Sequence, residues 1–111
     1  MAEPTVDSQP VRIMHTMIRV GDLDRSISFY RMLGMQQLRR CDFPNGRFSI
    51  AMMGYGAEQD TAVLELTHNW DTTSYDLGTA FGHVALATGN VNELCEHLAA
   101  HGATIVRAPG P

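Results

Sequence analysis

The chain has 111 residues, of which 44% are apolar and 18% are charged, so it is long enough for one domain with a modest core. A net charge of −4 offers no basic surface for nucleic acid, and no apolar run reaches the roughly 18 residues of a membrane span. The polar N-terminus excludes a secretory signal, and two cysteines are too few for a disulfide framework. We therefore expect a cytoplasmic protein that binds neither nucleic acid nor membrane, with a disordered tail over residues 1–12.

The first predicted elements are a strand over residues 13–20 and a helix of about 11 residues that follows it. Between them stand Gly21 and Asp22, and aspartate caps helices by accepting hydrogen bonds from backbone N–H groups. Gly34 stands where a glycine ends a helix in the left-handed conformation. The helix has apolar residues at i, i+4 and i+7, which define one face: Leu23, Ile27 and Tyr30.

Three further strands are predicted after this helix, over residues 35–41, 47–53 and 61–68. The segments Pro-Asn-Gly at 44–46 and Gly-Tyr-Gly at 54–56 mark the turns between them, because glycine and asparagine adopt the backbone angles of tight turns. One unit is therefore β-α-β-β-β.

The start of this unit recurs 68 residues later, because residues 15–35 align without a gap with residues 83–103. The matching pairs are His15 and His83, Gly21 and Gly89, Asp22 and Asn90, and Gly34 and Gly102. The second copy predicts a strand over 83–88, a helix after it and a last strand over 103–107. The apolar face of this second helix comprises Val91, Cys95 and Leu98.

The repeat predicts an α+β fold of tandem βαβββ modules in which the second module is incomplete. We expect one domain over residues 13–111. Its parts would be module one at 13–68, a linker at 69–81 and a truncated module two at 82–111.

Glu65 lies within a run of strand-forming residues, and strand side chains alternate between the two faces of a sheet. Leu64 and Leu66 take the face that packs on the helix, so Glu65 can face a cavity on the other side, shared with His15 and His83. A half-buried carboxylate needs a cation or hydrogen-bond donors, and imidazoles with carboxylates suit Ni²⁺, Co²⁺ or Zn²⁺. The alternatives are histidines at the surface and a glutamate on a solvated strand face. A symmetric site would need a fourth ligand at position 133, which lies beyond the 111 residues.

A family resemblance is carried by four segments: HTMIRVGDLDRSISFYRMLGM, GYG, AVLELTHNW and LGTAFGHVAL. Together they closely resemble glyoxalase I, the lactoylglutathione lyase of the short bacterial and trypanosomatid type. This family belongs to the vicinal-oxygen-chelate superfamily, also called the glyoxalase/bleomycin-resistance fold, which is built from paired βαβββ modules. The resemblance extends from residue 13 to about residue 110.

The resemblance implies a role for five residues. The metal ligands would be His15, Glu65 and His83, and the family's homodimer would place His83 of one chain against the other two ligands of its partner. Arg19 would bind the glutathione carboxylate, and Asn69 would hold the same ligand, while His68 replaces a more usual tyrosine.

The implied activity is methylglyoxal detoxification. The substrate would be the hemithioacetal of methylglyoxal and glutathione, which the family isomerises to S-lactoylglutathione through an enediolate. The implied cofactor is a divalent metal, with Ni²⁺ or Co²⁺ favoured over Zn²⁺, and glutathione enters as part of the substrate. The residues leave open whether another thiol, such as trypanothione, replaces glutathione.

The chain departs from the family pattern in three places. The family's fourth ligand and catalytic base, a glutamate in a C-terminal DPDGY…LEL segment, has no match in the 111 residues. A lysine-glycine loop has no match either, and the FYRMLGM segment is one residue shorter than usual. No catalytic residue is therefore assigned, and we expect little or no isomerase activity from this 111-residue form alone.

Three alternatives stay open at this stage. The chain could be a non-catalytic glutathione- or metal-binding glyoxalase-like module. It could be another enzyme of the superfamily, such as an epimerase, which shares the histidine and glutamate ligands without Arg19 and Asn69. The sequence could also be a fragment or the product of a frameshift.

Overall fold

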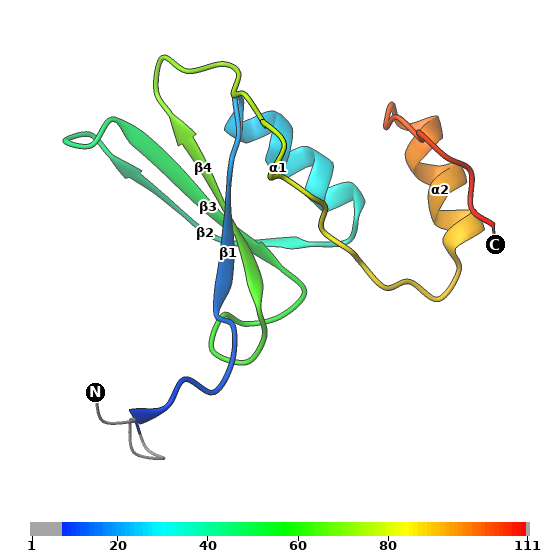
Figure 1. Ribbon diagram of the computed structural model, residues 1–111, viewed down its shortest axis with the longest axis horizontal. Helices are drawn as coiled ribbons and strands as arrows, with labels where there is room; N and C mark the ends of the chain where they lie inside the picture. The colour runs from blue at the N-terminus through cyan, green and yellow to red at the C-terminus, as the bar shows by residue number, and fades with distance from the viewer. Residues whose placement is uncertain (1–7, 111) are drawn as a thin grey trace.

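The computed structural model describes residues 8–110, so the tail expected over residues 1–12 lies largely outside the described part. Four strands form one sheet in the order β1-β4-β3-β2 (Figure 1). They are β1 (His15–Arg19), β2 (Gln36–Phe43), β3 (Phe48–Gly54) and β4 (Val63–Asn69). β1 runs parallel to β4, and the other two pairings are antiparallel. The predicted strands are thus all found in the first unit, with ends displaced by one or two residues.

The helix α1 (Leu23–Met32) covers one face of this sheet (Figure 1). Asp22 caps it as predicted, since its carboxylate accepts a hydrogen bond from the backbone N–H of Arg25 at 3.0 Å. Gly34 follows the helix with φ of +87°, a conformation that costs a glycine little. The core between helix and sheet consists of Leu23, Ile27, Met35, Ala51, Met53, Leu64 and Leu66.

The opposite face of the sheet is also apolar, although no described helix covers it. Its buried side chains are Ile50, Met52 and Val63, with Leu38, Cys41 and Phe48 packed against them. The candidate functional site lies on this second apolar face of the sheet.

The second unit differs from the prediction. α2 (Val91–Ala100) forms, with Asn90 accepting from the backbone N–H of Glu93 at 3.0 Å and Gly102 at φ of +96°. The strands predicted over 83–88 and 103–107 do not form within the described residues. A helix satisfies its backbone groups internally, whereas a strand needs a neighbour, and no described strand pairs with either segment.

As a result, α2 stands apart from the sheet and from α1 (Figure 1). Of its predicted apolar face only Leu98 is buried, while Val91 is 49% exposed. The described residues therefore contain one complete βαβββ unit and the isolated helix of a second. This agrees with the α+β class and with an incomplete second module.

No helix among residues 8–110 is long and apolar enough to cross a membrane.

Candidate functional site

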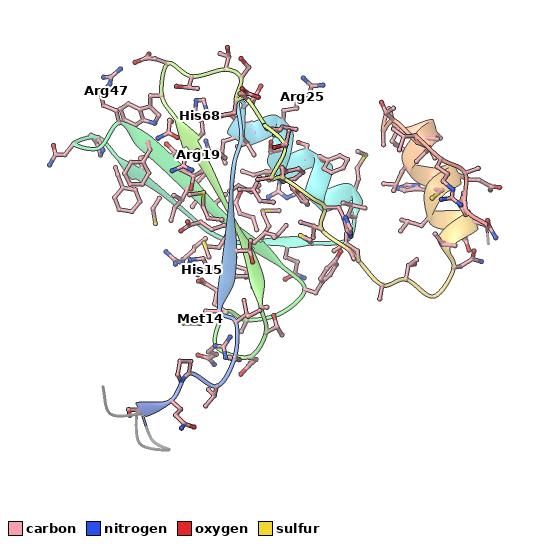
Figure 2. The ribbon with its side chains drawn as sticks, in the orientation of Figure 1. Met14, His15, Arg19, Arg25, Arg47 and His68 are labelled. Atoms are coloured by element: carbon pink, nitrogen blue, oxygen red, sulfur yellow. The ribbon has the colours of Figure 1, made fainter. Side chains whose placement is uncertain are left out.

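Two neighbouring strands position four of the five candidate residues. In the parallel pair of β1 and β4, Met17 lies opposite Glu65 and Arg19 lies opposite Thr67. Residues paired in this way point to the same side of a sheet, and every second residue does so along each strand. His15 is therefore one diagonal step from Glu65, and Arg19 is one diagonal step from Asn69. Figure 2 shows His15 and Arg19 at the two ends of β1.

A cavity of about 440 Å³ opens on this face of the sheet. Its polar lining is Arg19, Glu65, Thr67 and Asn69, and its apolar lining is Met17, Ile50, Phe43 and Phe48. The rings of Phe43 and Phe48 stack with their centroids 4.8 Å apart, which gives the cavity a flat aromatic wall. Glu65 thus faces away from the α1 core, as strand alternation predicts.

Glu65 is half-buried, and its carboxylate makes no hydrogen bond or ion pair with any residue from 8 to 110. His15, on the neighbouring strand, is exposed, and its imidazole likewise makes no hydrogen bond within this range. The Glu65 carboxylate still reaches solvent but borders the apolar face at Met52, and a cation would stabilise its charge in such partly apolar surroundings. The carboxylate and the imidazole are both ligand types of late first-row metals, so this pair fits a divalent ion.

His83 is not part of this cluster, contrary to the expectation of one cavity shared by all three ligands. It lies in the segment between β4 and α2 and lines a separate cavity of about 470 Å³ against Ile18, Phe29 and Tyr30. Ile18 and Tyr30 pack on the α1 core, so His83 is on the other side of the sheet from Glu65. Within residues 8–110, no three metal-ligating side chains come together. One chain supplies two of the three expected ligands to this face.

The far end of the site holds the other predicted pair. Arg19 is exposed and forms no ion pair within the described part of the chain, so its guanidinium is available to an anion. Asn69 is held by Tyr75, whose hydroxyl donates to Asn69 Oδ1 at 3.2 Å and accepts from the Asn69 backbone N–H at 3.3 Å. These two bonds leave the amide nitrogen of Asn69 to donate elsewhere.

An ion pair that the sequence reasoning missed stands beside His15. Arg39 of β2 donates to both carboxylate oxygens of Glu58, at 2.8 and 3.1 Å. The hydrogen bond from Arg39 lowers the pKa of Glu58, with smaller contributions from the positive charges of Arg39 and His15. Strand alternation could have placed Arg39 on the same face as Phe43. Nothing in the sequence pattern points to Glu58, which lies in a turn.

The other missed feature is the stacked pair of Phe43 and Phe48. These residues flank the turn at 44–47 and lie directly opposite each other in the antiparallel pair of β2 and β3. Two aromatic residues placed on either side of a hairpin turn are a usable signal for such a pair.

Comparison with known proteins places this geometry in a family. The model of the Glyoxalase/Bleomycin resistance protein/Dioxygenase superfamily matches residues 12–111. A lactoylglutathione lyase of Neisseria meningitidis serogroup A is 53% identical over 102 residues, covering 91% of this chain and 74% of the relative. The chain belongs to the lactoylglutathione lyase, or glyoxalase I, family. The resemblance of the four sequence segments is thereby confirmed.

Solved structures of the glyoxalase I family agree in fold. The enzyme of Leishmania major, described as trypanothione-dependent, is 47% identical with a TM-score of 0.79, covering 83% of this chain and 67% of that one. Glyoxalase I from Zea mays is 42% identical with a TM-score of 0.88, covering 90% of this chain and 36% of the maize chain.

Proposed function

We propose that this chain acts in metal-dependent isomerisation of the methylglyoxal–glutathione hemithioacetal to S-lactoylglutathione, in the cytoplasm. The observation that carries the proposal is the unpaired, half-buried Glu65 beside His15, on the same two strands as Arg19 and Asn69. Membership of the glyoxalase I family supports it.

The spacing along β4 suits a thiol tripeptide. Glu65 and Asn69 are four residues apart, or roughly 13 Å of strand, and an extended tripeptide spans roughly 10 Å. Arg19 would pair with a carboxylate of glutathione while Asn69 donates a hydrogen bond to the same molecule. Both contacts would hold the sulfur substituent over Glu65 and lower the entropic cost of alignment. The aromatic wall of Phe43 and Phe48 would contact the apolar part of the substrate.

The metal would be held by His15 and Glu65 of one chain and by His83 of a second copy. His83 lies on the other side of its own sheet, so a homodimer that shares its sites is the arrangement that assembles all three ligands. When bound, the ion acts as a Lewis acid toward the substrate oxygens. We infer Ni²⁺ or Co²⁺ in preference to Zn²⁺ from the tendency of the short family type.

A titration with Ni²⁺ tests the metal ligands directly. Glu65→Gln keeps the shape of the side chain and removes its charge, so the affinity for Ni²⁺ should fall by at least about tenfold. Glu58→Gln is the matched control, because this carboxylate is already paired with Arg39. Equal affinity of the parent and Glu65→Gln would remove Glu65 from the ligand set.

Binding of an S-alkyl glutathione separates the glyoxalase from an epimerase. Arg19→Ala should weaken this binding by about tenfold or more, since hydrogen bonds to charged groups contribute about 1.5–3 kcal/mol. Arg31→Ala, on the exposed side of α1, serves as the control for loss of a positive charge. Unchanged affinity in Arg19→Ala would favour a superfamily enzyme that does not use glutathione.

A further inference from the structure

The C-terminal end of α2 carries two histidines that the proposed function does not use, one in the last turn and one at the C-cap position. His97 and His101 are four residues apart, so they lie one turn from each other on the same side of the helix. Their ring centroids are 4.3 Å apart with an angle of 42° between the ring planes. Both residues are exposed. The two imidazoles are thus in direct contact with each other.

The hydrogen bonding of His101 fixes which ring nitrogen is available. Its Nδ1 lies 2.8 Å from the carbonyl oxygen of His97, and a carbonyl can only accept. Nδ1 therefore carries the proton, and in the neutral ring Nε2 keeps its lone pair. Histidines that bind metals commonly donate their other N–H to a backbone carbonyl in this way, because the bond fixes both tautomer and ring orientation.

A carboxylate close to His97 favours the binding of a cation at this end of α2. Glu93 lies one turn before His97, and both residues line a cavity of about 330 Å³ with Thr88, Asn90 and Leu94. The Glu93 carboxylate accepts a hydrogen bond from the side chain of Asn90 at 3.4 Å, and no cationic side chain lines this cavity.

We propose that His97 and His101 form a second metal site, which binds a divalent late transition metal such as Zn²⁺ through two imidazole nitrogens and water. The spacing of i and i+4 is the one by which two histidines on a helix hold a single zinc ion. Imidazole is a preferred ligand of Zn²⁺, Ni²⁺ and Cu²⁺. Among residues 8–110 no group of three metal-ligating side chains forms, so water completes the coordination.

A bound ion would link the last turn of α2 to its C-cap residue. This helix has no sheet beneath it in the described structure, so it lacks the tertiary packing that normally stabilises a helix of 10 residues. An ion that binds the helical form and not the unfolded form shifts the equilibrium toward the helix. The site is independent of Glu65 and of the isomerase proposal.

The test uses Zn²⁺ as the probe and the 111-residue chain carrying Glu65→Gln, so that the first site contributes little. The ring nitrogens of the histidines are followed by NMR during the titration. We expect the resonances of His97 and His101 to shift together and saturate. We also expect the affinity to fall by at least about tenfold in His97→Gln and in His101→Gln, since loss of an outer-shell partner alone costs 10- to 100-fold.

Glu96→Gln is the control on the same helix, and its affinity for Zn²⁺ should equal that of the Glu65→Gln chain. The helical circular dichroism signal, measured at increasing Zn²⁺ concentration, provides a second readout. This signal should increase in the control and remain unchanged in both histidine variants. The proposal is wrong if either histidine can be replaced without loss of affinity, or if the two sets of ring resonances do not shift together.

Discussion

The two copies of the repeat share their helix signals and differ in what surrounds the helix. α1 and α2 both begin at a capped residue and both end before a glycine with positive φ, at Gly34 and Gly102. α1 lies on a four-stranded sheet, whereas α2 stands apart (Figure 1). Helix limits follow from local sequence, while strands and buried faces depend on partners distant in the chain. The same substitution in each copy should therefore have different consequences.

The largest contrast is expected for buried leucines. Leu66 of β4 is fully buried in the α1 core, so Leu66→Ala should lower the free energy of unfolding by about 2–5 kcal/mol. Leu98 of α2 is buried away from that core, so Leu98→Ala should leave the main unfolding transition unchanged. Urea denaturation of both variants checks this. A comparable loss in Leu98→Ala would mean that α2 folds as one unit with the sheet.

The paired glycines before each helix give the next contrast. A Cβ at Gly21 would overlap the backbone oxygen of Thr73, whereas one at Gly89 would meet nothing within 4 Å. Gly21→Ala should therefore cost about 1–3 kcal/mol, because backbone must shift to make room. Gly89→Ala should stay within about 0.5 kcal/mol of the parent. Thermal unfolding of the two variants side by side distinguishes these effects, and equal melting temperatures would contradict the close approach at Gly21.

The two capping residues should act on different measurements. Asp22→Ala should lower global stability by about 1 kcal/mol, because α1 is part of the cooperative core. Asn90→Ala removes the same kind of hydrogen bond from α2, so it should reduce helical circular dichroism while leaving the unfolding midpoint of the sheet in place. A shift of that midpoint in Asn90→Ala would indicate that the two units are coupled.

The smallest effect is expected from pH. The pKa of Glu58 is lowered from its ordinary value of 4.5, chiefly by the hydrogen bond from Arg39. The ion pair therefore contributes stability above pH 4.5, and this contribution is lost as the pH falls below 4.5 through the lowered pKa. Acid titration of unfolding should show a smaller loss in Glu58→Gln than in the parent. Parallel pH profiles would show that the pair contributes nothing.

The sequence predicts the first unit well because its signals are local or periodic. The caps at Asp22 and Asn90 and the outward direction of Glu65 follow from residue type and from the alternation of a strand. The position of His83 could not be predicted in this way, because the strand expected around it requires a neighbour that the repeat alone does not supply. The ion pair of Arg39 with Glu58 was also missed, since it joins a strand to a turn 19 residues away.

The assignment of His15, Glu65 and His83 to one metal site rests on two chains sharing it. The most direct test of this shared site mixes two variants that each lack one of its ligands and measures Ni²⁺ binding. A Glu65→Gln chain and a His83→Gln chain each lack a ligand in every site. In a mixed dimer, however, one of the two shared sites is complete. It combines His15 and Glu65 of the His83→Gln chain with His83 of the Glu65→Gln chain.

Both variants also carry His97→Gln, so that Ni²⁺ bound at His97 and His101 does not enter the count. After the two variants are unfolded and refolded together, half of the dimers should be mixed, so about a quarter of the shared Ni²⁺ sites should return. Each variant refolded alone should show none of these shared sites. If the mixture binds no more Ni²⁺ than the two variants do separately, the three residues do not form a site between two chains.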